Sequence, residues 1–241
     1  MTAPHCAIRG AQSADSRSGV TLIELMVVVG LMAVVLAIAV PFLSDWMGNQ
    51  RARAAARSLA DLLMLARGEA IRTGNRYVLF FGNPGTTDAS GNPVENDGGW
   101  VPVLLINDGP PVGSDCEIDA GEVFEAIEPA DGISWGVTDA DVAVSTDSGA
   151  APFNASPPPA WDGATFADPG NSKVNWLLFR PDGIPVGFSG AAGSCGAIGG
   201  VGSGGGAFYV TNGERDFAVV LSPLGGVRLH LWNRSTGAWS G

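Results

Sequence analysis

A run of nineteen uncharged residues from Leu25 to Leu43 is the feature that most restricts how this chain folds. Glu24 and Asp45 bound the run on its two sides. A helix of this length is long enough to cross a hydrocarbon core of about 30 Å. Arg9 and Arg17 precede it, and basic residues ahead of a span favour a cytoplasmic N-terminus. We therefore expect a single-pass helix with the remainder of the chain on the far side of the membrane.

The candidate processing site precedes this apolar run. An ordinary secretory signal has an apolar stretch of about 7–15 residues followed by its cleavage site. Here Ser18 and Gly19 lie before the run, so cleavage after Gly19 would remove a polar leader and keep the hydrophobic helix. The stretch GVTLIE resembles the type III signal of type IV pilins and type II secretion pseudopilins. This resemblance implies that a prepilin peptidase cuts between Gly19 and Val20 and methylates the new amino terminus of Val20.

Two further positions extend the resemblance. Glu24 would be fifth and Pro41 twenty-second in the mature chain, as in that family, although Val20 stands where Phe or Met is commoner. A carboxylate at the helix centre costs about 2.5–3.5 kcal/mol on insertion scales, so Glu24 needs a partner. The resemblance implies the amine of a neighbouring subunit's Val20; the alternative is a carboxylate hydrated among headgroups. Pro41 is expected as a tolerated kink in a membrane helix.

The helical pattern continues beyond the apolar run. An apolar face with helical spacing is formed by Leu59, Leu62, Leu63, Ala66 and Ala70. Gly74-Asn75 is a stop signal, so the sequence predicts one helix from Val20 to about Thr73, about 80 Å long at 1.5 Å per residue. We expect a solvated basic face, rather than a membrane or nucleic-acid patch, from Arg51, Arg53 and Arg57.

The rest of the chain alternates short apolar runs with turn clusters such as Asn83-Pro84-Gly85. We predict strands at Arg76–Phe81, Trp100–Ile106, Glu122–Ile127, Lys173–Phe179, Ala207–Val210, Phe217–Leu221 and Val227–Trp232. The predicted class is α+β, with a long N-terminal helix packed on a C-terminal antiparallel β-sheet or β-sandwich domain. The order of these pieces, with LLFRPDG and VVLSPLGGVRL, resembles the GspH/FimT branch of minor pseudopilins and minor pilins.

Four segments follow from these patterns. They are a leader at 1–19, a transmembrane or filament-core half-helix at 20–43, an amphipathic half-helix at 44–75, and a periplasmic β-rich domain at 76–241. The basic and acidic residues are separated, because 1–76 carries eight basic and five acidic residues while 77–241 carries five and nineteen. Two long stretches, 131–170 and 190–206, are rich in small and turn-forming residues. We interpret both as surface loops, with contacts to partner pilins as the alternative.

Candidate chemical sites are few. An acidic loop contains four oxygen-bearing side chains, Asp115, Glu117, Asp119 and Glu122. Calcium prefers six to eight oxygen ligands, but the spacing does not fit an EF-hand, so we interpret them as solvated acids and expect neither a metal nor a cofactor. His230 shares a strand face with Arg228 and Trp232 and is expected to be half-exposed rather than a catalytic base.

Cleavage at Gly19 would also change the cysteine count. Cys6 would leave with the leader, and Cys116 and Cys195 would remain. Because exported domains meet an oxidising compartment, a Cys116–Cys195 disulfide is one hypothesis and two free thiols are the other.

We compared function classes on this basis. The preferred one is a non-enzymatic minor pseudopilin of a type II secretion system, in the bacterial inner membrane and, after assembly, in the pseudopilus. Its implied partners are other pilin-like subunits, the prepilin peptidase, the inner-membrane assembly platform and lipid. The alternative is a minor pilin of a type IV pilus, in fibre priming or DNA uptake. We do not expect nucleic-acid binding, because residues 225–228 read Gly-Gly-Val-Arg, without the first arginine of the Gly-Arg-x-Arg motif of DNA-binding members, and the domain is acidic. No constellation supports an anchored enzyme.

Overall fold

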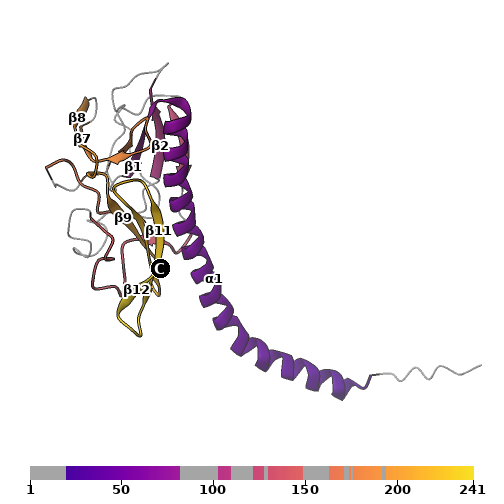
Figure 1. Cartoon of the computed structure of the whole chain (residues 1–241). Helices are drawn as coiled ribbons and strands as arrows, with labels where there is room; N and C mark the ends of the chain where they lie inside the picture. Colours follow the sequence, from indigo (N-terminus) through magenta and orange to yellow (C-terminus); the bar gives the residue numbers. More distant parts are fainter. Residues whose placement is uncertain are drawn as a thin grey trace, which may run out of the picture. The chain divides into compact units, whose positions relative to one another are not determined.

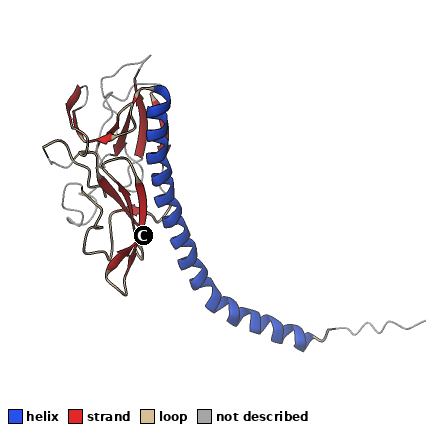
Figure 2. Cartoon of the chain, viewed as in Figure 1, coloured by secondary structure: helices blue, strands red, loops and turns tan. Residues whose placement is uncertain are grey.

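A computed structural model describes residues 20–81, 103–109, 122–127, 130–148, 163–170, 174, 176–191 and 194–241 (Figure 1). The chain divides into two compact units, Met1–Ser44 and Asp45–Gly241. The described part contains one long helix followed by antiparallel sheets (Figure 2). The predicted α+β class is therefore confirmed.

Helix α1 comprises 52 residues, Leu22–Thr73, and is continuous through Pro41. It ends where the sequence predicts, because Gly74 adopts a left-handed conformation with a φ of 72°. The amide of Gly74 donates a hydrogen bond of 3.0 Å to the carbonyl oxygen of Ala70, which closes the last turn. The helix begins two residues later than expected, at Leu22 instead of Val20.

The C-terminal half of α1 buries one face against the sheets (Figure 1). This face consists of small and aliphatic side chains that are at most 3% exposed: Ala52, Ala56, Leu59, Leu62, Leu63, Ala66 and Ala70. The five positions predicted from helical spacing are all among them. Alanine in four of the seven positions lets the helix backbone lie close to the strands.

The first sheet has the strand order β3-β2-β1-β5-β6. Its strands are β1 (Arg76–Phe81), β2 (Val103–Asp108), β3 (Val123–Ile127), β5 (Trp176–Phe179) and β6 (Pro185–Val186). Leu79 in the central strand lies opposite Leu105 of β2 and Leu177 of β5. These three leucines are fully buried and face the helix in the main core.

The second sheet has the order β12-β11-β10-β9-β4. Its strands are β4 (Ser134–Trp135), β9 (Gly206–Thr211), β10 (Asp216–Leu221), β11 (Val227–Asn233) and β12 (Ala238–Ser240). Strand β10 pairs along its whole length with β9, and Phe208, Phe217 and Val219 join the same core as the helix face. One helix therefore closes a core to which both sheets contribute.

The described parts of the stretch 131–170, residues 131–148 and 163–170, are not simply the surface loop that the composition predicts. Trp135, Val144 and Phe166 are at most 4% exposed and belong to the core clusters. Phe166 contacts Phe208 with a ring-centroid distance of 4.9 Å. The prediction is wrong because isolated apolar residues in a polar stretch give no periodic signal, although each one fills a place in the core.

Two carboxylates, one buried and one partly buried, attach this stretch to the second sheet. Asp216 is fully buried and accepts hydrogen bonds of 2.8–2.9 Å from the backbone amides of Thr138, Asp139 and Ala140. Asp147 accepts hydrogen bonds from the hydroxyl groups of Tyr209, at 2.9 Å, and Thr165, at 2.8 Å. Burial, and secondly the charge of Asp147, raise the pKa of the Tyr209 phenol far above its usual value. These bonds satisfy polar groups that burial would otherwise penalise.

The glycine-rich stretch 190–206 also departs from the expected loop. Strand β7 (Phe188–Ala191) pairs with strand β8 (Ser194–Ile198) in a separate hairpin, with an irregularity between Phe188 and Gly190. Strand β9 then begins at Gly206, inside the same stretch. Glycine is tolerated in such irregular strands because it accepts close backbone approach. A Cβ added to Gly206 would lie 2.7 Å from the ring of Phe166, so only glycine fits at this position.

Candidate functional site

The N-terminus of α1 carries a reciprocal pair of hydrogen bonds between Thr21 and Glu24. The backbone amide and the hydroxyl group of Thr21 each donate to Oε2 of Glu24 at 3.0 Å. The amide of Glu24 donates in turn to Oγ1 of Thr21 at 3.3 Å. This is a capping box, in which Thr21 is the N-cap and Glu24 is the third helical residue. The sequence TLIE, a threonine followed three residues later by a glutamate, carries the signature of this motif.

The capping box places the Glu24 carboxylate one residue away from the expected new amino terminus. Val20 directly precedes Thr21 and is 76% exposed. The box satisfies backbone donors that a helix leaves unpaired in its first turn, which matters most where no water is present. Gly19 lies outside the described residues, so the cleavage position remains a prediction.

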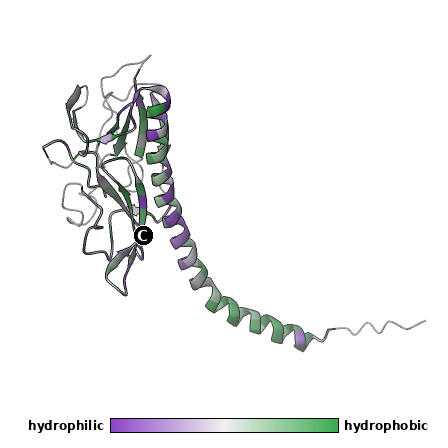
Figure 3. Ribbon diagram, viewed as in Figure 1, coloured by the Kyte–Doolittle hydropathy of each residue, from purple (hydrophilic) through white to green (hydrophobic). Residues whose placement is uncertain are grey.

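The segment that follows the cap presents apolar side chains on all sides (Figure 3). The large hydrophobic residues from Leu22 to Leu43 whose side chains are described are 48–76% exposed. By length and composition, this part of α1 can cross a membrane. Pro41 lies within its continuous helix, and its side chain is not described.

Two glycine turns meet over the C-terminal half of α1. Gly183 lies in the turn between β5 and β6, Gly225 in the turn between β10 and β11, and both have positive φ, 75° and 84°. A Cβ added to Gly183 would lie 2.5 Å from Cδ1 of Ile71, and one added to Gly225 would lie 3.1 Å from the carbonyl oxygen of Gly183. Arg67 fixes the second turn through a 3.0 Å hydrogen bond from its Nη1 to the carbonyl oxygen of Gly225. The turns of LLFRPDG and VVLSPLGGVRL are thus helix-docking elements.

The predicted acidic loop is only partly described. Asp115, Glu117 and Asp119 lie outside the described residues. Glu122 is 2% exposed, so the interpretation as a solvated acid is wrong for this residue. Its carbonyl oxygen accepts a 3.0 Å hydrogen bond from the Asn107 amide, which draws the residue against β2. Among the described residues, no three potential ligands come together in a metal site.

His230 occupies the predicted half-exposed place on β11. Burial, and secondly the nearby Arg228 charge, lower the pKa of its imidazole. Arg228 itself is exposed. The predicted alternation along the strand is confirmed, because Val227, Leu229 and Leu231 pack against the main core while Trp232 belongs to a second cluster.

The disulfide hypothesis is not tested by the structure. Cys116 lies outside the described residues. Cys195 is in β8, and its side chain is not described. The pairing of the two cysteines therefore remains a prediction.

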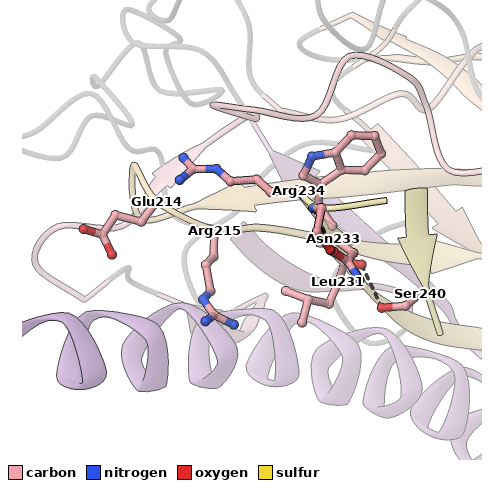
Figure 4. Close-up of a pocket in the computed structure, with 8 residues that line it drawn as sticks. Glu214, Arg215, Leu231, Asn233, Arg234 and Ser240 are labelled. Carbon is pink, nitrogen blue, oxygen red and sulfur yellow. Dashed lines mark hydrogen bonds between the residues drawn. The ribbon is translucent and has the colours of Figure 1, made fainter. Parts of the chain in front are cut away.

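One polar pocket opens at an end of the second sheet (Figure 4). It has a volume of about 380 Å³ and is lined by Glu214, Arg215, Leu231, Trp232, Asn233, Arg234, Ser235 and Ser240. Arg234 pairs with Asp139, and the Ser240 hydroxyl donates to the Leu231 carbonyl oxygen at 3.0 Å. Glu214 is the one carboxylate in this lining, which holds no histidine or cysteine. The lining therefore offers neither an acid–base pair nor an activated nucleophile.

Comparison with known proteins yields two matches. The prokaryotic N-terminal methylation motif matches residues 15–40, which include the capping box and most of the apolar segment. The family described as type II transport protein GspH matches residues 55–225, more than half of the chain. No curated protein and no solved structure gives a significant match.

Proposed function

Because this chain belongs to the family of the type II transport protein GspH, we propose that it is a minor pseudopilin of a type II protein secretion system. In this role it is a structural subunit of the pseudopilus and not an enzyme. The observation that carries the proposal is the order of the two matches, with a methylation motif over the membrane helix and the GspH match over the domain. The docking of Gly183 and Gly225 on α1 supports it, because both glycines lie within the matched residues 55–225.

Maturation follows from the N-terminal motif. The prepilin peptidase removes residues 1–19 by cleavage between Gly19 and Val20 and methylates the amine of Val20. Residues 20–43 then serve as the membrane anchor and later as the filament core. Residues 44–75 carry the domain formed by 76–241 on the periplasmic side of the inner membrane.

Assembly involves other pilin-like subunits, the inner-membrane assembly platform and lipid. Glu24 contributes a negative charge that the Val20 amine of a neighbouring subunit neutralises. Within one chain the same carboxylate caps α1 through Thr21, so two roles meet in one side chain. The capping bonds hold the carboxylate at the helix end, where an incoming cationic amine can reach it.

Substitutions can separate the two roles of Glu24. Glu24→Gln removes the charge and keeps a side chain that suits a capping box, while Thr21→Ala removes the cap and keeps the charge. We expect Glu24→Gln to be cleaved normally but to enter pseudopili poorly, and Thr21→Ala to enter them. Leader cleavage and recovery of the chain in sheared filaments are the measurements. Normal assembly of Glu24→Gln would contradict charge pairing and leave capping as the role of Glu24.

A deletion strain tests the assignment to a secretion system. We expect loss of extracellular enzymes with normal surface pili, twitching and DNA uptake. The methylation motif is also compatible with a minor pilin of a type IV pilus. Loss of pili or DNA uptake with normal secretion would favour that alternative and overturn the proposal.

Cleavage has its own test. Gly19→Leu should leave a precursor that retains its leader and an unmethylated amino terminus, measured by the mass of the intact chain. Normal processing of this variant would mean that the cleavage site lies elsewhere.

A further inference from the structure

The polar pocket at the end of the second sheet contains one cation, Arg215, that forms no ion pair with another described residue. Arg234, the other cation of the lining, is paired with Asp139. Glu214 is exposed, and Figure 4 shows its side chain and that of Arg215 pointing in different directions. The pocket therefore has an uncompensated positive charge at Arg215, which suits an anionic group.

The strand register brings a second hydrogen-bond donor to Arg215. Phe217 of β10 lies opposite Leu231 of β11. Two residues further along each chain segment, the same antiparallel register brings Arg215 opposite Asn233, on the face of the sheet that is turned toward α1. Oδ1 of Asn233 accepts hydrogen bonds from the amide and the hydroxyl group of Ser235, at 3.0 and 2.7 Å, and its Nδ2 group has no acceptor within the described part of the chain. A guanidinium group facing an amide donor suits the oxygen atoms of a phosphate.

The size of the pocket restricts the ligand. Its volume of about 380 Å³ is near the lower end of the range of small-molecule sites, which is about 300–1,000 Å³. Leu231 and Trp232 are the apolar residues of the lining, and the other six residues are polar or charged. A small phosphate ester therefore suits this pocket better than an acyl chain.

The pocket lies beside the first turns of the C-terminal half of α1. Arg215 follows the turn between β9 and β10, and its carbonyl oxygen accepts a hydrogen bond from the amide of Asn212 in that turn. Nδ2 of Asn212 donates to Oδ1 of Asn49 on α1 at 3.2 Å. A Cβ added to Gly48 would also lie 3.4 Å from this Nδ2 atom. The turn that carries Arg215 is therefore attached to residues 48 and 49 of the helix.

This part of α1 has the features of a segment at a membrane surface. Trp46 is 59% exposed and Met47 is 42% exposed, and tryptophan is enriched where a membrane meets water. Asn49 is six residues beyond Leu43, the end of the apolar run, which corresponds to about 9 Å of helix. The polar layer on each side of a hydrocarbon core is about 5–8 Å deep. Lipid phosphate groups are therefore within reach of an arginine side chain at this level.

We propose that the pocket at Arg215 and Asn233 binds the phosphate group of a membrane phospholipid. The inference rests on the proposed function to the extent that residues 20–43 anchor the chain in a membrane. A soluble phosphate ester offers the same chemistry, but the anchor keeps phospholipid head groups at a high local concentration, so a weak contact suffices. The bound head group holds the end of the second sheet at the membrane surface.

A photo-crosslinking amino acid at Glu214 tests the contact in the full-length chain. The chain is inserted into nanodiscs of phosphatidylethanolamine and phosphatidylglycerol, and the adduct is measured by the mass of the intact chain. Glu214 is exposed and lines the pocket, so we expect a mass increase of one phospholipid. The same probe at Leu224 is the control and should give no lipid adduct, because this residue is 65% exposed in the turn at the opposite end of β10. A chain that does not enter the bilayer would contradict the anchor and, with it, the proposal.

Charge reversal tests the role of Arg215 in this contact. We expect Arg215→Glu to reduce the lipid adduct several-fold. Arg228→Glu, which also reverses an exposed arginine of the second sheet, should leave the adduct unchanged. Equal urea midpoints of the two variants serve as the control for folding. No lipid adduct, equal adducts from the probes at Glu214 and Leu224, or an adduct indifferent to Arg215→Glu would overturn the proposal.

Inorganic phosphate separates the two sources of the phosphate group. We expect the lipid adduct at Glu214 to persist in an excess of inorganic phosphate, compared with sodium chloride of the same ionic strength. Loss of the adduct in phosphate alone would mean that the pocket takes a soluble anion, and it would overturn the assignment to a phospholipid.

A deletion strain separates this proposal from the proposed function. Loss of secretion on deletion, without a lipid adduct that depends on Arg215, would refute the lipid site and leave the pseudopilin assignment in place. A lipid adduct that depends on Arg215, in a chain whose deletion affects pili and not secretion, would support the lipid site and refute the assignment to a secretion system.

Discussion

The two halves of α1 have the same secondary structure and opposite relations to their surroundings. From Leu22 to Leu43 the described large apolar side chains are about half to three-quarters exposed, and the described part of the chain does not cover them. From Asp45 to Thr73 one face is buried, and it is covered by the protein's own sheets. Hydrophobicity alone therefore does not specify packing, because the distribution of apolar residues around the helix decides whether one face or the whole circumference needs an apolar partner.

Truncation of one leucine in each half gives the largest contrast. Leu59→Ala removes a side chain that is 1% exposed in the main core and should lower the free energy of unfolding by about 2–5 kcal/mol. Leu31→Ala, at a position that is 64% exposed, should leave that free energy nearly unchanged. Urea denaturation of the full chain in detergent is the measurement. Equal losses of stability in the two variants would contradict the contrast between a buried face at Leu59 and an exposed one at Leu31.

A smaller loss of stability is expected when the hydrogen bonds of Tyr209 with Asp147 and Val144 are removed. These bonds lie in the domain that covers the C-terminal half of α1. Tyr209→Phe removes the donor to Asp147 and the acceptor of the Val144 amide, and we expect a loss of about 1–3 kcal/mol. Tyr77 is also buried but lies outside this network, so Tyr77→Phe is the matched control. Chemical denaturation at neutral pH compares the two variants, and an equal, negligible loss would show that the network contributes little.

The same tyrosine gives a pH dependence. Its pKa is raised in the folded chain, so the folded state keeps its proton at pH values where the unfolded chain has lost it. The contribution to stability is therefore complete below about pH 10 and decreases as the pH rises above it. Denaturation midpoints between pH 8 and 11 should fall less steeply in Tyr209→Phe than in the unchanged chain. Parallel curves would contradict the assignment to Tyr209.

Removal of the Thr21 cap tests whether the N-terminal half of α1 unfolds independently of the C-terminal half. Thr21→Ala should destabilise the first turn by about 1 kcal/mol, because the Glu24 amide loses its acceptor and the carboxylate loses a donor. Amide hydrogen exchange in detergent should become faster at Leu22 to Glu24 and stay unchanged beyond Asp45. Faster exchange throughout α1 would mean that the two halves are coupled.

The smallest effect is expected on the exposed side of the second half. Arg51→Gln changes a solvated residue and should alter the free energy of unfolding by less than about 0.5 kcal/mol. Ala52→Gln, one position further and fully buried, is the matched substitution and should be strongly destabilising. Comparable thermal midpoints of the two variants would refute the buried face.

Local patterns predicted the parts of this fold that local physics determines. The helix end at Thr73, the strand Arg76–Phe81 and the buried face at Leu59 and Leu63 are confirmed, because each depends on periodicity or on a stop signal in a few adjacent residues. The capping box was equally local, and TLIE carries its signature. The hydrogen bonds between Thr21 and Glu24 could therefore also have been predicted from the sequence.

The parts that the sequence did not predict depend on distant partners. Val144 and Phe166 are buried because Tyr209 and Phe208, more than forty residues later, hold and cover their segments. Strands of two residues, such as Ser134–Trp135, are too short for alternation to mark them. Burial of Glu122 likewise depends on the neighbouring strand, which places its carbonyl group against Asn107.

The two glycine turns that meet over Arg67 have a mechanical consequence. One turn belongs to the first sheet and the other to the second, and both attach to the same stretch of α1. Tension applied to the helix along its axis therefore enters both sheets at once, through the hydrogen bond from the Arg67 side chain to the Gly225 carbonyl oxygen and through close glycine contacts. If such a subunit were pulled out of a membrane by its helix, the force on its domain would be distributed over two sheets instead of one.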